Sequence, residues 1–142
     1  MREFGLRKDD WIIIDTETSG LGERDVVLEI AALDGNGIVL LDTRVKLPPR
    51  KRIGAKSQQV HGITREDLKV APMWSDVRKK LDMIANGKEC IAYNASFDRR
   101  IIEQTDAAHD VHGAKLAWVD IMPVYNARAI VTGKHQTTWA QL

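Results

Sequence analysis

The chain is poor in cysteine, has no excess of charge of either sign and contains no long hydrophobic run. A single cysteine among 142 residues excludes a disulfide-stabilised scaffold and a zinc site built from cysteines. This residue, Cys90, opens the apolar run Cys90–Tyr93, so we expect a buried structural thiol rather than a nucleophile. Lys and Arg number 21 against 20 Asp and Glu, so any basic surface for nucleic acid must be local.

Membrane and export signals are also lacking. No apolar run reaches about 18 residues, the length that a membrane-spanning helix needs. The first residues, Met1–Phe4, do not have the apolar stretch of a secretory signal peptide. We therefore expect a cytoplasmic protein with no membrane partner, and we interpret residues 1–142 as a single domain.

The first half of the chain has the pattern of β-strands. An uninterrupted apolar run predicts a central strand buried on both faces, and a turn rich in Gly, Asn and Asp predicts an antiparallel hairpin after it. Pro48 and Pro49 end the third strand, and a basic loop follows through Lys56. The predicted strands span Trp11–Asp15, Val26–Leu33 and Ile38–Leu47, with the turn at Asp34–Gly37.

The second half predicts helices that alternate with strands. Thr64 has the character of a helix N-cap, with Asp67 in the first turn, and Gly87 stands where a glycine would follow the helix end. Between them, apolar residues repeat at helical spacing at Met73, Val77, Leu81 and Ile84. The later predicted elements are a strand Glu89–Tyr93, a helix from Ser96 to about Ala108, a strand Lys115–Val119, a helix from about Asp120 to Thr132 and a helix start at Thr138–Leu142.

This order of elements predicts an α/β fold. Three antiparallel strands followed by parallel βαβα units are typical of a ribonuclease-H-like mixed five-stranded sheet with flanking helices. In such a sheet the first strand is central, and its end lies close to the helix that follows the fourth strand. We therefore expect Asp15, Glu17 and Asp98 in one cleft.

Two short motifs carry the candidate chemistry. Asp15-Thr16-Glu17-Thr18 follows the first apolar run, and Asn94-Ala95-Ser96-Phe97-Asp98 opens a later helix. Three carboxylates are the ligands that a site needs to hold hard divalent cations against a phosphodiester. Structural interpretations stay open, since Asp15 and Glu17 could end a strand, Asn94 and Asp98 could cap a helix, and Phe97 could be core.

Together these motifs resemble those of the DEDD superfamily of 3′–5′ exonucleases. Val60-His61-Gly62-Ile63-Thr64, with Glu66-Asp67-Leu68 and Ala71-Pro72 after it, is similar to the subgroup that contains the bacterial polymerase III proofreading subunit. The resemblance extends from about Trp11 to Leu142. It implies a DNA or RNA 3′ end as substrate, a DNA polymerase as a partner to consider, and release of nucleoside monophosphates.

The resemblance also implies roles for single residues. Two Mg²⁺ or Mn²⁺ ions would be held, with Asp15 bridging both, Glu17 on one, and Asp98 on the other through water. Substrate contacts are implied for Thr16 and Thr18 at the 3′-terminal nucleotide, and beside the strand for Asn94, Phe97 and His61. For His61, support of its own loop is the interpretation that we favour over catalysis.

The chain departs from one branch of the superfamily. The DEDDh branch has a third motif, in which a His acts as general base and an Asp five residues later is the fourth metal ligand. In this chain His109, His112 and His135 are each followed by an alanine at that spacing: Ala114, Ala117 and Ala140. Asp120 lies too early to replace the missing acid. We therefore expect a domain without its C-terminal helix. Whether residues 1–142 are active on their own stays open, because losing a general base costs about 10²–10⁴ in rate.

Three hypotheses remain open. The first, which we favour, is an exonuclease whose reading frame continues past Leu142. The second is a degenerate domain that binds nucleic-acid ends without cutting them, and the third is a docking module for a polymerase. A homodimer is compatible with the first, because an uncovered apolar face would favour self-association.

Two basic runs, Arg50-Lys51-Arg52 and Arg78-Lys79-Lys80, are candidates for phosphate contacts or merely solvated faces. The first is the better candidate, because its loop leads toward the segment that contains His61.

Overall fold

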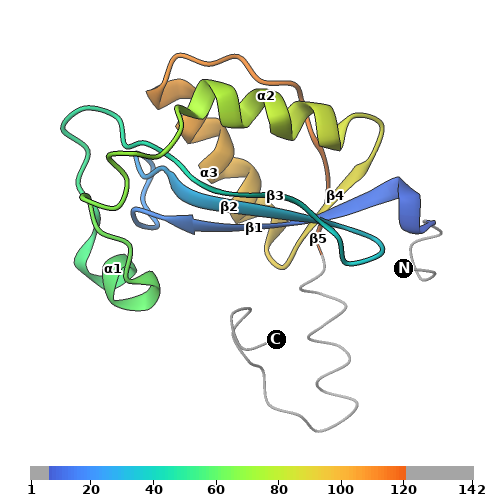
Figure 1. The fold of residues 1–142 in the computed structure, drawn as a ribbon, viewed down its shortest axis with the longest axis horizontal. Helices are drawn as coiled ribbons and strands as arrows, with labels where there is room; N and C mark the ends of the chain where they lie inside the picture. Colours follow the sequence, from blue (N-terminus) through green and yellow to red (C-terminus); the bar gives the residue numbers. More distant parts are fainter. Residues whose placement is uncertain (1–6, 121–142) are drawn as a thin grey trace, which may run out of the picture.

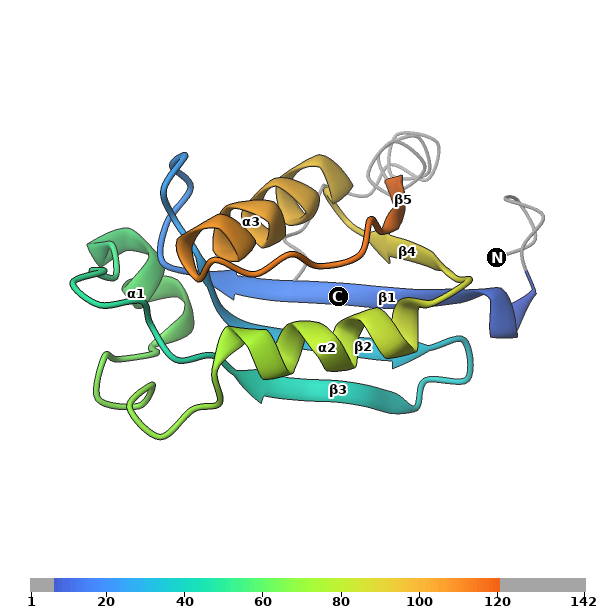
Figure 2. The ribbon, with the colours of Figure 1, turned by 90° about the horizontal axis from the view of Figure 1, so that it is seen from above.

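The computed structural model describes residues 7–120, which form a five-stranded sheet with two helices on one face (Figures 1 and 2). The strand order is β3-β2-β1-β4-β5, so β1 is central, as the sequence predicted. β1 pairs antiparallel with β2 and parallel with β4, which confirms the mixed sheet. After a short 3-10 helix at Lys8–Asp10, the elements are β1 Trp11–Thr18, β2 Val27–Asp34, β3 Val39–Arg44, α1 Ala55–His61, α2 Trp74–Ala85, β4 Glu89–Ala92, α3 Ala95–Ala108 and β5 Ala117–Asp120.

The turn between β2 and β3 confirms the predicted hairpin. The Asp34 Oδ1 atom accepts hydrogen bonds from the backbone N–H groups of Asn36 and Ile38, both at 2.9 Å. Gly37 has a φ of +81°, a conformation that glycine adopts at little cost. Local side-chain bonds and one glycine therefore set the register of β2 against β3.

The main core lies between the sheet and the helices α2 and α3, which cover the same face (Figure 2). Trp74 and Leu81 of α2 are fully buried, as are Ile101 of α3 and Ile12 of β1. Burying an apolar side chain of this size contributes about 1.5–3 kcal/mol, so this face is the main stabilising layer. A smaller cluster of Val26, Leu28, Ile63 and Leu68 packs near the end of the sheet where α1 lies.

A buried arginine joins α2 to α3 and to the segment that leads into β5. Arg78 is 4% exposed, and its Nε atom lies 3.1 Å from Asp106 Oδ1, while Nη1 contacts Asp82. Nη2 donates to the Ala114 carbonyl at 2.8 Å, and Trp74 Nε1 donates to Asp106 Oδ1 at 2.7 Å. We refer to this cluster as the Arg78 clamp. The second basic run is thus partly structural.

β1 is longer than predicted. We expected it to end at Asp15, but pairing with β2 continues through Thr18, and Asp15 stands opposite Ala31. The polar residues stay in the strand because the partner strand supplies backbone hydrogen bonds to them. Asp15 and Glu17 therefore lie within a strand rather than after one.

The segment between β3 and α2 also differs from the prediction. The basic loop gives way to the short helix α1, and the helix predicted from Thr64 is a turn. Thr64 N–H donates to Asp67 Oδ2 at 2.9 Å and Asp67 N–H donates to Thr64 Oγ1 at 3.2 Å, a pairing that imitates a helix start. Pro72 follows, and α2 begins at Trp74.

Other predictions hold in the described part of the chain. Gly87 has a φ of +71° just after α2, and α3 spans almost its predicted length. Cys90 is fully buried, and burial raises the pKa of its thiol to about 12. No helix within residues 7–120 is long and apolar enough to span a membrane. The two helices predicted after residue 120 lie outside the described residues.

Candidate active site

The candidate site forms where β1 continues past the end of β4. β4 pairs with β1 only along Trp11–Ile13, because the chain leaves β4 after Ala92 to begin α3. Beyond that point the first turn of α3 approaches β1. The hydroxyl of Thr16 donates a hydrogen bond of 3.0 Å to Asp98 Oδ1, which ties the two sequence motifs together.

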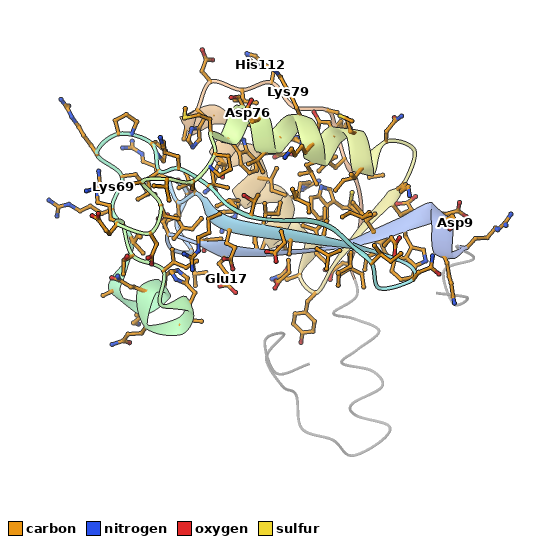
Figure 3. The ribbon with its side chains drawn as sticks, viewed as in Figure 1. Asp9, Glu17, Lys69, Asp76, Lys79 and His112 are labelled. Carbon is orange, nitrogen blue, oxygen red and sulfur yellow. The ribbon has the colours of Figure 1, made fainter. Side chains whose placement is uncertain are left out.

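The first motif divides its side chains between the two faces of the sheet. Successive side chains of a strand point to opposite sides. Thr16 faces α3 together with the core residue Ile14, whereas Asp15 and Glu17 share the other face. Figure 3 shows Glu17 on the side of the sheet away from α2. Asp15 is exposed and Glu17 is half-buried, so solvent and ligands can reach both carboxylates.

Asp98 is a buried carboxylate with an unusual proton affinity. It is 7% exposed, and this burial raises its pKa to about 7. The Thr16 hydrogen bond opposes the rise, whereas the negative charges of Asp15 and Asp120 add to it. A carboxyl group whose pKa is raised by burial and by nearby negative charges is often found at a functional site.

Glu17 is perturbed in the same direction. Burial and the charge of Asp15 raise the pKa of Glu17, His61 opposes this rise, and Glu29 adds to it. Glu29 stands opposite Glu17 in the register of β1 and β2, and Arg44 stands opposite Glu29 on β3. The Arg44 Nε and Glu29 Oε2 atoms are 3.4 Å apart. One row of charges thus crosses three strands.

Sequence reasoning missed Glu29 and dismissed Asp120 as lying too early in the chain. The antiparallel register of β1 against β2 decides which residue of β2 faces Glu17, and that register was the signal that could have found Glu29. Asp120 ends β5 opposite Ala92 of β4, and its charge raises the pKa of Asp98. It therefore lies beside the site, although strand length alone could not reveal this.

His61 holds the backbone around the site. Its Nδ1 atom accepts a hydrogen bond from the Ile63 N–H at 3.0 Å, so in the neutral ring Nε2 carries the proton and donates to the Thr18 carbonyl, also at 3.0 Å. Both ring nitrogens are occupied by the chain itself. This geometry supports the loop-supporting interpretation of His61.

Thr18 and Asn94 of the two motifs contact the backbone close to them in the sequence. The Thr18 hydroxyl donates to the Gly20 carbonyl at 2.9 Å, which leaves it to shape the loop after β1. Asn94 is the N-cap residue of α3, and its carbonyl accepts the N–H groups of Phe97 and Asp98. Its side chain makes no capping hydrogen bond, so the cap alone does not explain this asparagine.

A cavity of about 620 Å³ adjoins Glu17. Phe97, Val60 and Leu21 give it apolar walls, and the last two side chains are 79% and 76% exposed. The Arg100 guanidinium lies 5.5 Å from the centre of the Phe97 ring, which favours a fixed ring position. The cavity is lined by Thr16, Glu17, Thr18, Gly20, Leu21, Gly54, Ala55, Lys56, Ser57, Val60, His61 and Phe97.

The carboxylates have the right donor chemistry for a hard divalent cation. Asp15, Glu17 and Asp98 supply oxygen atoms alone, and the pKa of the last two is raised first by burial and then by nearby negative charges, which a cation would offset. Within residues 7–120, however, no three acidic, His or Cys side chains lie close enough to form a metal cage. The type of ligand atom therefore suits a divalent cation, but the carboxylates are farther apart than the ligands of a complete metal site.

Solved structures of exonuclease I share this fold. The apo enzyme superimposes with a TM-score of 0.72 at 13% identity, over 89% of this chain and 32% of its own. Exonuclease I of E. coli in complex with a dT13 oligonucleotide gives 0.69 at 15% identity, over 89% of this chain and 31% of its own. The protein thus has a ribonuclease-H-like exonuclease fold.

The chain belongs to the exonuclease family RNase_T, whose sequence pattern matches residues 12–128. The uncharacterized exonuclease CP81 of Escherichia phage 186 is 41% identical over 98 residues, which cover 69% of this chain and 50% of that protein. DNA polymerase III subunit epsilon of Pasteurella multocida is 28% identical over 61% of this chain and 38% of its own. The predicted family is confirmed, and the chain spans half or less of these relatives.

Proposed function

We propose that this chain carries the active site of a metal-dependent 3′–5′ exonuclease that releases nucleoside monophosphates from the 3′ end of DNA or RNA. The observation that carries the proposal is the hydrogen bond from Thr16 to Asp98, which brings Asp98 to the part of β1 that contains Asp15 and Glu17, beside a cavity lined by Thr16 and Glu17. Family membership supports it, as does the structural similarity to E. coli exonuclease I in complex with a dT13 oligonucleotide.

In this proposal Asp15, Glu17 and Asp98 hold Mg²⁺ or Mn²⁺. When bound, a pair of such ions stabilises the attacking and leaving oxygens of a phosphodiester. Glu17 and Asp98 must be ionised to serve as ligands, and because both have a raised pKa, cation binding should strengthen as the pH rises toward and above 7. A zinc-bound exonuclease I–ssDNA complex among the structural neighbours is consistent with a metal site here.

The other residues place the substrate. Phe97 offers an apolar face for a base or sugar at the cavity wall. The Asn94 side chain makes no capping hydrogen bond to α3 and is assigned to contact the substrate strand. Thr16 positions Asp98, and Thr18 and His61 fix the backbone after β1. Relatives named as polymerase III epsilon subunits make a DNA polymerase the first protein partner to test.

A second function is favoured by two observations. Both nitrogens of His61 are engaged, and residues 7–120 contain no closed group of metal ligands. A domain that binds 3′ ends without cutting them would show this arrangement. It would bind oligonucleotides equally well with Mn²⁺ and with EDTA.

The test is digestion of a 5′-labelled single-stranded oligonucleotide by the whole chain with Mg²⁺, Mn²⁺ or EDTA. We expect a metal-dependent ladder that shortens from the 3′ end and disappears in Asp15→Asn. The matched control is Asp42→Asn, because Asp42 is aligned with Asp15 through Ala31 across the same sheet. No ladder, together with metal-independent binding, would replace the exonuclease by the end-binding module.

A further inference from the structure

The near-neutral net charge of the chain hides a strongly basic stretch. Residues 44–69, here named the basic segment, contain eight Lys and Arg against two Asp and Glu. The rest of the chain contains 13 against 18. The positive charge is therefore concentrated in one stretch of 26 residues, and the remainder of the molecule is acidic.

The basic segment lies beside the candidate active site. It leaves β3, forms α1 and ends in the turn before α2, all at one end of the sheet (Figure 1). Lys69 lies at this end and Asp9 at the opposite one (Figure 3). Lys56 and Gly54 of the segment line the same cavity as Glu17. A polymer that leaves the cavity on this side would meet the segment at once.

Most cations of the segment have no acidic partner in the described residues. Glu66 pairs with Lys69 at 2.8 Å, and Asp67 is hydrogen-bonded to Thr64, which lowers the pKa of its carboxyl. Lys51 pairs with Asp25 at 3.0 Å. Within residues 7–120, no ion pair engages Lys46, Arg50, Arg52, Lys56 or Arg65.

The loop that presents these cations is held to β1 and contains one strained residue. Gly54 N–H donates to the Ser19 carbonyl at 2.7 Å, and the Arg65 side chain donates to the Lys51 carbonyl. Arg50 has a φ of +66°, in the left-handed region that costs a residue with a side chain about 1–2 kcal/mol. The two tethers fix the course of this loop and with it the backbone positions of Arg50 and Arg52.

The second basic run lacks these features. Arg78 is buried in its clamp, and Lys79 lies on the opposite side of the sheet from Glu17 in Figure 3. Lys79 and Lys80 are exposed, and neither lines the cavity. They form a matched control of equal charge.

We propose that the basic segment carries the sugar–phosphate backbone of the nucleic-acid strand upstream of its 3′ end, over Arg50 and Arg52 and toward the turn at Arg65. This inference rests on the proposed function for the direction of the strand and for the assignment of the cavity to its terminal nucleotide. Phosphodiesters are favoured over an acidic protein surface because the segment adjoins the cavity assigned to the terminal nucleotide. Such contacts position a strand without reading its sequence.

The experiment compares Arg50→Asn/Arg52→Gln with Lys79→Gln/Lys80→Gln, both in EDTA so that no strand is cut. Asparagine tolerates the left-handed backbone at position 50, and thermal melts establish that both variants are folded. Kd is measured over a salt series for single strands of about 4 and about 16 nucleotides. A polyglutamate peptide serves as the competing acidic polymer.

We expect Arg50→Asn/Arg52→Gln to bind the long strand about tenfold more weakly than the wild type. The slope of the logarithm of the binding constant against the logarithm of the salt concentration should become shallower by about 1.4, because each lost phosphate contact removes about 0.7. The short strand and the Lys79→Gln/Lys80→Gln variant should be unaffected. Equal slopes for both variants, no binding by the wild type, or displacement by polyglutamate as effective as by the oligonucleotide would each overturn the proposal.

The outcomes also separate this proposal from the function. Metal-dependent digestion with unchanged slopes would leave the exonuclease intact and remove the basic segment from its substrate path. Changed slopes without digestion would retain the surface and remove the activity.

Discussion

Two ionisable side chains in this domain are almost equally buried and are treated in opposite ways. Arg78 on α2 is 4% exposed and lies against Asp106 and Asp82. Asp98 on α3 is 7% exposed, is bonded by the Thr16 hydroxyl and faces the negative charges of Asp15 and Asp120. One buried charge is neutralised, and the other is crowded by charges of its own sign.

The difference separates a structural cluster from a functional one. Desolvating a charge is costly, and a cluster that only stabilises the fold compensates each buried charge with an opposite one. The Arg78 clamp does so and joins three segments of chain. Asp98 gains no such compensation from the described residues, which is the charge arrangement expected of the cation site proposed above.

The largest loss of stability is expected when the Arg78 clamp is removed. Arg78→Met leaves Asp106 and Asp82 without their counter-charge, and we expect a loss of about 3–5 kcal/mol in the free energy of unfolding. Urea denaturation measures this. Lys79→Met, an exposed neighbour on the same helix, should change stability by less than about 0.5 kcal/mol. Similar effects of both substitutions would show that the clamp is not structural.

Asp98→Asn, in contrast, should increase the free energy of unfolding when no metal ion is present. The folded-state pKa of Asp98 is about 7, above the ordinary value of 3.8, so the folded state binds its proton more tightly than the unfolded chain. The stability that this proton confers is complete below about pH 4 and is lost as the pH rises to about 7. At pH 8 the asparagine variant should be more stable by up to about 4 kcal/mol.

Thermal melts in EDTA between about pH 4 and 8 test this sign. The advantage of the variant should disappear at the acidic end of the range. A gap in melting temperature that stays constant with pH would show that Asp98 is not the titrating group.

Adding Mn²⁺ should reduce the stability advantage of Asp98→Asn over the wild type. At a concentration about 100 times its Kd, a ligand that binds only the folded state stabilises it by about 2.7 kcal/mol. We expect this gain for the wild type and little of it for Asp98→Asn, measured as the shift in melting temperature. Equal shifts in both proteins would place the ion elsewhere.

The smallest change in activity and stability is expected for Glu29→Gln, on the face of the sheet away from α2. Glu29→Gln removes a negative charge that faces Glu17, so the pKa of Glu17 should fall toward its ordinary value. Digestion should then begin at a slightly lower pH, while loss of the exposed pair with Arg44 costs about 0.2–1 kcal/mol. Arg44→Gln breaks the same pair but keeps the charge of Glu29, and its pH profile should not move to lower pH.

Much of the fold could be predicted because local signals agreed with one another. The hairpin has an aspartate and a glycine at the positions that its turn requires, and α3 has an apolar stripe that fits the core. α1 was missed because it has no buried residue and no apolar stripe. It is held at its ends by contacts with β1, which depend on tertiary structure.

The residues of the two motifs were predicted as site residues, but the acidic residues that neighbour them in space were not. Asp15, Glu17 and Asp98 were found because short motifs keep their order in the chain. The cross-strand neighbour Glu29 depends on the register of β1 and β2, and the approach of Asp120 depends on where β5 ends. Spacing along a sequence contains little information about either.

The buried thiol of Cys90 has a practical consequence for site-specific labelling. Because its pKa is about 12 and its side chain is fully buried, it remains protonated and shielded from maleimide reagents in the folded protein. A cysteine introduced on the surface, for example Lys69→Cys, would therefore be the preferred point of attachment for a dye without removal of the native residue. Fluorescence from that dye could follow a labelled oligonucleotide along the surface in real time.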